Sequence, residues 1–254
     1  MKKFLFSMLL CATTFGLVSC QNEDQGPSLT KTNYTLYSDA TTKIEGAGLS
    51  NAVWDSENEF VASAEGDELT SFLVGSTTIK SGSSKIFVTV KPRYTLYTEP
   101  LMLWGYTKSQ IIAKLGTPKS ETATSIIYET GNSSVPYALY LFENNCLTSC
   151  GVVAQLSVAS NLVDFIGERY VIFSAEGTTA TFAHCYGKIS NPNVDYGGQM
   201  GYSSSIGGFA VVYVPSSSSS TLALNLEESR GDVKRMSSFV AVEKAVLDSG
   251  VRIK

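Results

Sequence analysis

Short runs in which hydrophobic and polar residues alternate dominate the chain between residues 32 and 92. Alternation with a period of two is typical of strands that bury one face. Glycine, asparagine and serine residues separate the runs at short intervals, as turns do between the strands of a β-sandwich. We therefore expect residues 32–92 to form a small all-β sandwich. The expected strands cover residues 34–37, 42–44, 52–54, 60–62, 70–74, 77–79 and 85–90.

After residue 93, some apolar residues follow the spacing of a helix rather than that of a strand. Thr107 followed by Gln110 has the form of a capping box, in which the Thr107 hydroxyl accepts from the Gln110 amide and the Gln110 side chain reaches back. The apolar residues that follow fall on one face of a short helix. Gly116 supplies a left-handed stop, and Pro118 blocks continuation. A helix over residues 107–116 is predicted.

A similar segment recurs further along the chain. Residues 111–116, Ile-Ile-Ala-Lys-Leu-Gly, match residues 162–167, Leu-Val-Asp-Phe-Ile-Gly, at a constant offset of 51 residues. Ser157 or Ser160 can cap this second helix, and strand-like stretches follow each helix. A period near 50 residues predicts a duplicated unit of one helix and one antiparallel meander. The alternative is two unrelated short helices that each end at a glycine.

The sandwich region also carries family motifs, and these resemble the bacterial Ig-like domain family, group 2. That family has a Trp-Ser-Ser-Asn turn, a Val-Ala pair, a Gly-containing strand and a closing Val-Thr-Val; Asp55 and Glu57 depart from it. The resemblance implies a spacer or adhesion module without catalytic residues, and it places Trp54 in the core. The matching segments are residues 53–58, 61–63, 75–79 and 87–90.

The region from about residue 101 to 215 resembles a second known repeat. Residues 111–118, Tyr128 and residues 142–147, Phe-Glu-Asn-Asn-Cys-Leu, are similar to motifs of small outer-membrane assembly lipoproteins and of β-lactamase-inhibitor-protein-like domains. The second unit has Glu168-Arg169 where the motif has proline, and it carries a long insertion rich in Gly and Ser. The resemblance implies a protein-binding sheet rather than an enzyme.

Two domains are therefore expected. An all-β Ig-like sandwich at residues 32–92 precedes an α+β domain at residues 93–254, with an antiparallel sheet and short helices. The duplicated units would cover about residues 101–158 and 159–215. A C-terminal helix at about residues 238–249 would dock on the sheet through apolar residues on one face.

Residues 1–19 have the features of a signal peptide, because two lysines precede an apolar run too short to span a bilayer. The run ends in Leu17-Val18-Ser19-Cys20, which resembles the lipobox of bacterial lipoproteins. This resemblance implies cleavage before Cys20 and attachment of lipid to it. Residues 20–31 would form a polar tether, whose acidic residues resemble the surface-export signal of Bacteroidetes lipoproteins. An exported protein anchored to the outer membrane is expected; an ordinary secretory peptide cut elsewhere is the alternative.

Charge and cysteine content narrow the functional classes. The chain has a net charge of −4, and loss of the two lysines in residues 1–19 makes it about −6, which argues against a nucleic-acid partner. Cys146, Cys150 and Cys185 remain after the leader and Cys20, an odd number for an exported protein. A bridge between Cys146 and Cys150 would close a tight loop, and one between Cys150 and Cys185 would cross-link two strands. Free buried thiols are equally compatible with the sequence.

The sequence gives little support for catalysis. His184 is the only histidine, which excludes sites with several histidine ligands, and its neighbour Cys185 would point to the opposite face of a strand. Asp55, Glu57 and Glu59 would share one face of an extended segment. A calcium site there is conceivable, but a solvated turn fits better since no Asp-x-Asp-x-Asn-Gly loop is present. We expect no metal, no cofactor and no enzymatic activity.

A binding role is expected instead. Residues 187–208 are predicted to form a long loop, where Tyr186, Tyr196 and Tyr202 could make an aromatic contact surface; an insertion without function is the alternative. The expected function is non-catalytic binding of a protein, or adhesion, by a membrane-anchored lipoprotein. The alternatives are glycan capture in nutrient uptake and, third, a hydrolase that would need carboxylates converging on His184.

Overall fold

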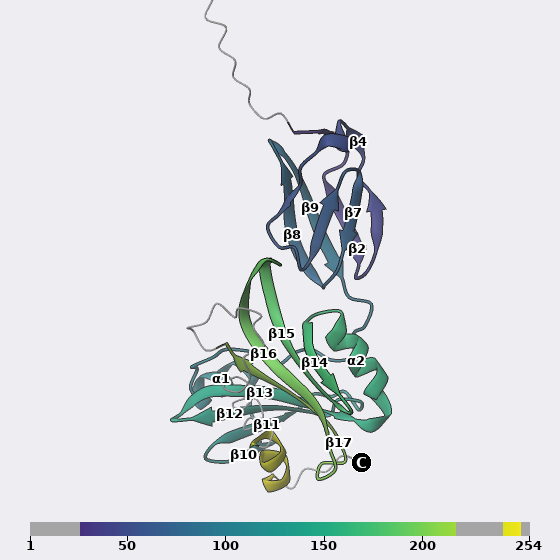
Figure 1. The fold of residues 1–254 in the computed structure, drawn as a ribbon. Helices are drawn as coiled ribbons and strands as arrows, with labels where there is room; N and C mark the ends of the chain where they lie inside the picture. The colour runs from purple at the N-terminus through teal and green to yellow at the C-terminus, as the bar shows by residue number, and fades with distance from the viewer. Residues whose placement is uncertain (1–25, 217–240, 250–254) are drawn as a thin grey trace, which may run out of the picture.

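A computed structural model describes residues 26–216 and 241–249 of the 254-residue chain (Figure 1). The predicted signal peptide, Cys20, the first residues of the tether and the start of the predicted C-terminal helix lie outside the described residues. The fold is largely β, with a few short helices. Among the described helices, none is long and apolar enough to cross a membrane.

Residues 26–91, the N-terminal part, form three small sheets around one hydrophobic cluster. Strand order is β2-β9-β8-β5 in the first sheet, β3-β7-β6 in the second and β1-β4 in the third. The central strands alternate buried and exposed residues, as the period of two predicts. The elements are β1 (Ser28–Leu29), β2 (Asn33–Tyr37), β3 (Thr41–Lys43), β4 (Gly46–Ala47), η1 (Leu49–Asn51), β5 (Asp55–Ser56), β6 (Ala62–Glu65), β7 (Glu68–Ser71), β8 (Gly75–Ser81) and β9 (Ser84–Lys91).

The core of the N-terminal part joins its two larger sheets. Leu69 of β7 is fully buried with Ile79 of β8 and Ile86 of β9. Trp54 packs against the same cluster, and its indole N–H donates to the Gly66 carbonyl oxygen at 2.9 Å. Trp54 therefore packs at the edge of this core as a partly buried residue, which agrees only in part with the expectation of a core residue.

The remaining described residues, the C-terminal part, are built on one eight-stranded sheet. Its order is β10-β11-β12-β13-β17-β16-β15-β14, and every neighbouring pair is antiparallel. A helix followed by four strands thus occurs twice, and the last strands of the two sets meet at the centre of the sheet. The elements are α1 (Lys108–Leu115), β10 (Ser120–Glu121), β11 (Ser125–Glu129), β12 (Tyr137–Glu143), β13 (Cys146–Gln155), η2 (Leu156–Val158), α2 (Ala159–Gly167), β14 (Val171–Glu176), β15 (Thr179–Lys188), β16 (Asn191–Ser203) and β17 (Gly208–Pro215).

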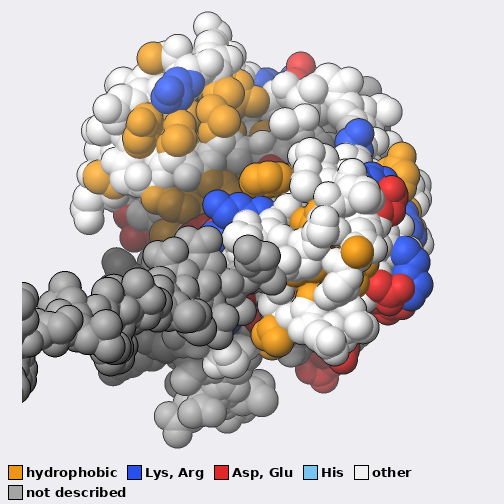
Figure 2. Space-filling view, turned by 90° about the horizontal axis from the view of Figure 1, so that it is seen from above, with side chains coloured by type: hydrophobic (Ala, Val, Ile, Leu, Met, Phe, Trp, Pro, Cys, Tyr) orange, Lys and Arg blue, Asp and Glu red, His pale blue; other side chains and the backbone are white. Residues whose placement is uncertain are grey.

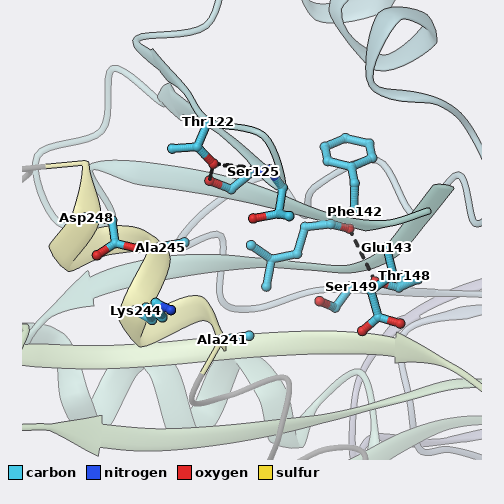
Figure 3. A pocket seen from close by; sticks show the side chains of 12 residues that line it. Thr122, Ser125, Phe142, Glu143, Thr148, Ser149, Ala241, Lys244, Ala245 and Asp248 are labelled. Atoms are coloured by element: carbon cyan, nitrogen blue, oxygen red, sulfur yellow. Dashed lines mark hydrogen bonds between the residues drawn. The ribbon is translucent and has the colours of Figure 1, made fainter. Parts of the chain in front are cut away.

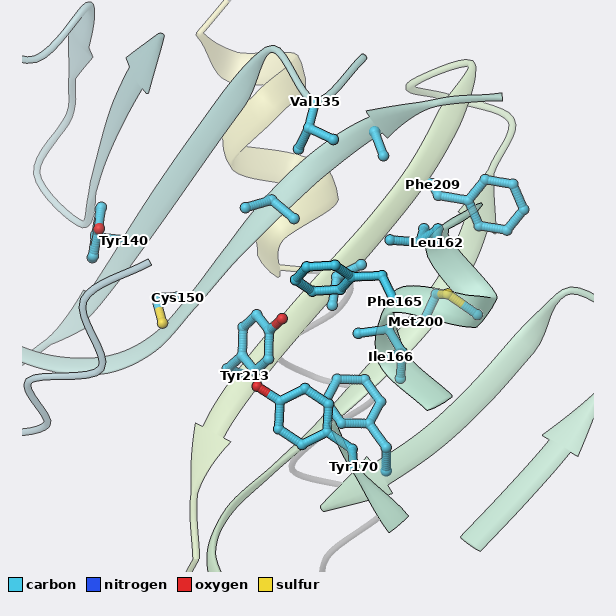
Figure 4. Close-up of a cluster of buried hydrophobic side chains, with 14 of the residues drawn as sticks. Val135, Tyr140, Cys150, Leu162, Phe165, Ile166, Tyr170, Met200, Phe209 and Tyr213 are labelled. Atoms are coloured by element: carbon cyan, nitrogen blue, oxygen red, sulfur yellow. The ribbon is translucent and has the colours of Figure 1, made fainter. Parts of the chain in front are cut away.

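Both faces of this sheet are buried, which explains why β17 is apolar at almost every position. On the first face, Leu162, Phe165 and Ile166 of α2 point at sheet residues that include Met200 and Tyr213 (Figure 4). On the second face, Val242 and Val246 of the helix over residues 241–248 pack against β12, β13 and β17. The predicted docking of this helix through one apolar face is confirmed for the residues described.

Local signals in the sequence agree with the geometry at two places. The capping box is present: the Thr107 hydroxyl accepts from the Gln110 N–H at 3.3 Å, and the Thr107 N–H donates to the Gln110 side chain at 2.8 Å. Gly116 ends α1 as predicted, but with φ of 84° and ψ of −163° it is not in the predicted left-handed helical conformation. Asn144 and Asn145 both have positive φ in the two-residue turn between β12 and β13, as the turn chemistry requires.

The predicted caps of the second helix are wrong. The residue before α2 is Val158, which makes no side-chain capping bond, and Ser160 lies inside the helix. Ser157 instead donates to the side chain of Gln155. The first turn of α2 follows directly from the 3-10 turn η2, so the chain enters the helix already coiled.

The prediction of a long loop at residues 187–208 is also wrong. Most of this stretch is β16, a strand of 13 residues that pairs with β15 and β17. Gly198 is required there, because an added Cβ would lie 2.4 Å from the Phe182 ring and 2.5 Å from the Val212 carbonyl oxygen. A glycine that looked like a loop residue therefore lets a phenylalanine on the neighbouring strand pack flat on the sheet.

The three cysteines of the described part are free thiols, which is one of the alternatives that the sequence left open; Cys150 and Cys185 are buried and Cys146 is exposed. Cys146 and Cys150 lie on one strand, β13, where four residues span roughly 13 Å, about twice the Cα separation that a disulfide allows. Cys150 and Cys185 are separated by β17 and β16, roughly 14 Å of sheet. Burial raises the pKa of the Cys185 thiol to about 11 and that of Cys150 well above its ordinary value.

The N-terminal and C-terminal parts are joined at a first contact around Glu168, which follows α2 and is 5% exposed. Its carboxylate accepts from the backbone N–H groups of Arg93 at 2.8 Å and Tyr94 at 3.1 Å, and from the Ser38 hydroxyl at 3.3 Å. Its backbone carbonyl accepts from the Val74 N–H at 2.8 Å. One residue of the C-terminal part thus binds the N-terminal part and the connecting segment together.

A second contact comes from the tip of the hairpin of β15 and β16, which reaches the N-terminal part (Figure 1). The Lys188 ammonium group pairs with Asp55 and lies 3.3 Å from a Glu59 carboxylate oxygen, and hydrogen bonding to Asp55 raises its pKa. Glu57 pairs with Lys80 instead. Lysine ammonium groups pair with all three carboxylates, and the side chains of Asp55 and Glu57 are 70% and 51% exposed, which fits the expected solvated segment better than a calcium site.

Candidate binding surface

The structure brings together two of the three predicted contact tyrosines. Tyr186 of β15 and Tyr196 of β16 lie on either side of His184, whose ring centroid is 6.5 Å from that of Tyr186 and 5.1 Å from that of Tyr196. Tyr202 is six residues further along β16 and packs edge-on against Phe209. We refer to His184, Tyr186, Tyr196 and Asp195 as the aromatic platform.

The platform has a well-defined geometry. The rings of His184 and Tyr196 are cross-strand neighbours and stack with an interplanar angle of 2°. Tyr186 is 40% exposed, and the His184 side chain is 37% exposed. Aromatic rings that are rigid and partly exposed offer large contact area at little cost in conformational entropy.

A bulge in β16 adds a carboxylate to this face. His184 pairs with Tyr196 and Cys185 with Val194, so Asp195 is the extra residue. The bulge turns its side chain toward the ring of His184, whose Nδ1 lies 3.1 Å from an Asp195 carboxylate oxygen. Asp195 is half exposed and keeps hydrogen-bonding capacity for a bound molecule.

Hydroxyl contacts hold the platform from beneath. The hydroxyl groups of Tyr196 and Tyr170 lie 3.3 Å apart, and the Tyr170 hydroxyl donates to the carboxylate of Glu99. The rings of Tyr170 and Tyr213 lie side by side below (Figure 4), and the Tyr213 hydroxyl is 2.6 Å from that of Tyr97. The platform therefore rests on buried groups that have hydrogen-bond partners.

Burial governs the protonation of these tyrosines. It raises the pKa of Tyr196 to about 12, and it raises the pKa values of Tyr97, Tyr170 and Tyr213 further. All four phenols are therefore neutral at physiological pH and serve as hydrogen-bond donors and acceptors rather than as anions.

The platform lies beside the contact between the two parts. Gly187 follows Tyr186 with φ of 87°, and its carbonyl oxygen accepts from the Glu59 N–H at 2.9 Å. Lys188 then reaches Asp55. Figure 2 shows hydrophobic and charged side chains close together in a recess of the surface as seen from above. A molecule bound to the platform would therefore also meet the edge of the N-terminal part.

Cys185 and His184 do not form a Cys–His pair. They are consecutive residues of β15, the strand opposite the bulge, so their side chains point to opposite faces, and burial raises the pKa of the Cys185 thiol to about 11. Within residues 26–216 and 241–249 no group of three His, Cys, Asp or Glu side chains could hold a metal ion.

The sequence predicts Tyr186 and Tyr196 as contact residues, but it does not indicate that His184 and Asp195 join them or that Glu99, Tyr170 and Tyr213 support them from beneath. The spacing of His184 and Tyr186, two apart on one strand, is the usable signal, since it places both on one face. The pairing of His184 with Tyr196 is not predictable from a loop at residues 187–208, because it depends on the strand that these residues form instead.

Comparison with known proteins gives no match to this chain among protein-family models, curated proteins or solved structures.

Proposed function

We propose that this protein is an exported, lipid-anchored surface protein that binds a protein partner through the aromatic platform, without catalysing a reaction. In this account Cys20 carries the lipid and residues 20–31 are the tether. The N-terminal part is an Ig-like spacer, and the C-terminal part is an α+β domain that carries the platform. The two sets of one helix and four strands arise from a duplication.

The observation that carries the proposal is the rigid stack of His184 on Tyr196 beside the exposed ring of Tyr186. Aromatic anchors of this kind dominate the binding energy of many protein interfaces. The hydroxyl contacts beneath the stack hold it in place before a partner arrives, which lowers the entropy lost on binding.

A spacer role for the N-terminal part is supported by its two contacts with the C-terminal part. Glu168 and Lys188 each bind backbone or side chains of the N-terminal part, so the two parts are expected to move as one body. A spacer that is held in this way presents the platform at a fixed distance from the tether.

A glycan partner is the second candidate. Asp195 lies beside the stacked ring of Tyr196, and an aromatic face next to a carboxylate suits a sugar, whose C–H groups pack on the ring while its hydroxyls donate to the carboxylate. The same platform would then serve nutrient uptake.

Binding assays on platform variants test the proposal. The purified chain and its Tyr186→Ala variant are compared on a glycan array and in pull-downs from outer-membrane and host surface extracts. Tyr202→Ala is the matched control, because Tyr202 is 39% exposed and lies on the same strand as Tyr196, β16, but outside the platform. We expect a protein partner that Tyr186→Ala loses and Tyr202→Ala retains. Glycan binding without a protein partner, lost in Tyr186→Ala, would replace the proposal with its alternative.

A further inference from the structure

A pocket of about 300 Å³ opens on the second face of the sheet, between β11–β13 and the helix over residues 241–248 (Figure 3). Its volume is at the lower end of the range for small-molecule sites. Leu141 and Ala245 supply apolar surface, and five hydroxyl side chains line the rest. These belong to Thr122, Thr124, Ser125, Thr148 and Ser149.

Ser149 offers a hydroxyl group to this pocket. The residue as a whole is 2% exposed and lines the pocket, and no hydrogen bond joins its hydroxyl to another described residue. Ser125 is 3% exposed but shares a hydrogen bond of 2.8 Å with Thr122. Since the Ser149 oxygen is not among the fully buried polar atoms that lack a partner, it is reached from the pocket and is a donor and acceptor available to a ligand.

Three charged side chains line the pocket without forming ion pairs with one another. Glu143 lies at the end of β12, and Lys244 and Asp248 lie one turn apart on the helix. None of the three forms an ion pair within the part of the chain that the structure describes. The pocket thus combines acceptor-only carboxylates, a donor-only ammonium group and hydroxyls that do both.

This mixture selects a neutral ligand rich in hydroxyl groups. An anion would meet two carboxylates with one ammonium group to balance them, and a cation would meet Lys244. A sugar ring presents hydroxyls that each donate to one group and accept from another, which suits a lining with an acceptor at Glu143, a donor at Lys244 and both functions at Ser149. Its ring C–H groups can pack on Leu141 and Ala245.

We propose that the pocket between the helix over residues 241–248 and strands β11–β13 binds a single neutral monosaccharide unit, with the Ser149 hydroxyl as a direct contact. This site goes beyond the proposed function, because it lies on the opposite face of the sheet from the aromatic platform. Failure of one site therefore says nothing against the other.

Saturation-transfer NMR on the purified full chain tests the pocket, with glucose, galactose, mannose and N-acetylglucosamine as separate probes and glycine and acetate as charged comparisons. We expect saturable transfer to at least one sugar and none to glycine or acetate. Transfer to no sugar at millimolar concentrations would overturn the proposal, and so would transfer to glycine or acetate in preference to the sugars.

Two variants locate the bound sugar. Ser149→Ala removes one hydrogen bond to the ligand and is expected to weaken sugar binding about three- to tenfold, while it leaves folding intact because the lost hydroxyl had no partner. Glu143→Gln, at an exposed position, is expected to weaken binding without touching the core. Ser160→Ala on the surface of α2 is the control and should bind as the parent does. Sugar binding that both pocket variants retain unchanged would place the sugar elsewhere and contradict the proposal.

Discussion

The carboxylate of Glu168 accepts the backbone N–H of Arg93 at 2.8 Å, and this contact fixes the segment that connects the two parts of the chain. The same carboxylate binds Ser38 of the N-terminal part and pairs with Arg169, whose guanidinium lies 3.7 Å from the centre of the Phe165 ring. A buried charge is tolerated here because each oxygen has partners. The connection between the parts is thus a packed and hydrogen-bonded contact rather than a free linker.

Replacement of Glu168 should weaken this contact. Glu168→Ala leaves the N–H groups of Arg93 and Tyr94 without acceptors and Arg169 without its carboxylate, and we expect a loss of about 2–4 kcal/mol in the free energy of unfolding. Limited proteolysis should also cut the segment 92–98 faster. Chemical denaturation measures the first effect. Glu129→Ala removes an exposed ion pair with Lys119 and is the control, expected to change little. Equal losses in the two variants would contradict the role given to Glu168.

Two glycines should respond oppositely to alanine. Gly198→Ala would place Cβ within 2.4 Å of Phe182 in the middle of the sheet, and we expect a loss of at least about 2 kcal/mol. Gly167→Ala, at the end of α2, meets no atom within 4 Å and should gain about 0.5–1 kcal/mol from helix propensity and a less flexible unfolded chain. Thermal unfolding of both variants compares them. A neutral Gly198→Ala would show that β16 and β15 do not pack as described.

The sequence predicts those features of the fold whose physical cause lies within a few residues along the chain. The capping box of Thr107 is fixed by neighbours along the chain, and the sequence pattern predicted it. The turn at Asn144 and Asn145 has a local cause of the same kind. The alternation in residues 85–90 likewise predicted β9, because one face of that strand is buried and the other is exposed. Hydrophobic periodicity identifies a strand wherever one of its faces is buried and the other is exposed to solvent.

The missed features have causes distant in sequence. Gly197 and Gly198 look like loop residues, and only the ring of Phe182 on the adjacent strand shows why a strand needs Gly198. Ser160 has the chemistry of a cap, but the preceding 3-10 turn removed the need for one. The ion pair between Lys188 and Asp55 joins residues 133 positions apart, so no local pattern in the sequence indicates it. The aromatic platform was found only in part for the same reason, since His184 and Tyr196 meet across the β15–β16 hairpin.

High pH should destabilise the protein through its buried tyrosines. The folded-state pKa values of Tyr140 and Tyr196 are raised to about 12 by burial, whereas exposed tyrosines ionise near 10. The unfolded chain therefore loses these protons first, so the stabilisation is complete below pH of about 10 and is lost as pH rises through about 12. Tyrosinate absorbance should show a group that ionises near pH 10 and a later one that coincides with unfolding. A single transition near pH 10 in the folded protein would contradict burial of these hydroxyls.

The proposed lipid anchor at Cys20 can be tested by finding which cell fraction contains the protein. Cys20→Ala removes the residue that would carry the lipid, and we expect the protein to leave the membrane fraction for the soluble one. Cys146→Ala replaces an exposed cysteine of the folded part and is the control, which should stay with membranes. Immunoblots of separated fractions distinguish the two variants. Persistent membrane attachment of Cys20→Ala would show that the segment before it is not a lipobox.

The central claim is that the aromatic platform is the binding surface. Photo-cross-linking in intact cells tests this claim most directly. A photoreactive phenylalanine analogue is placed at Tyr186 or, in a separate strain, at Tyr202, two positions of nearly equal exposure. We predict one discrete cross-linked protein from position 186, identified by mass spectrometry, that position 202 does not give and that His184→Ala diminishes. Equal products from both positions, or none from position 186, would contradict the claim that His184, Tyr186 and Tyr196 form the binding surface.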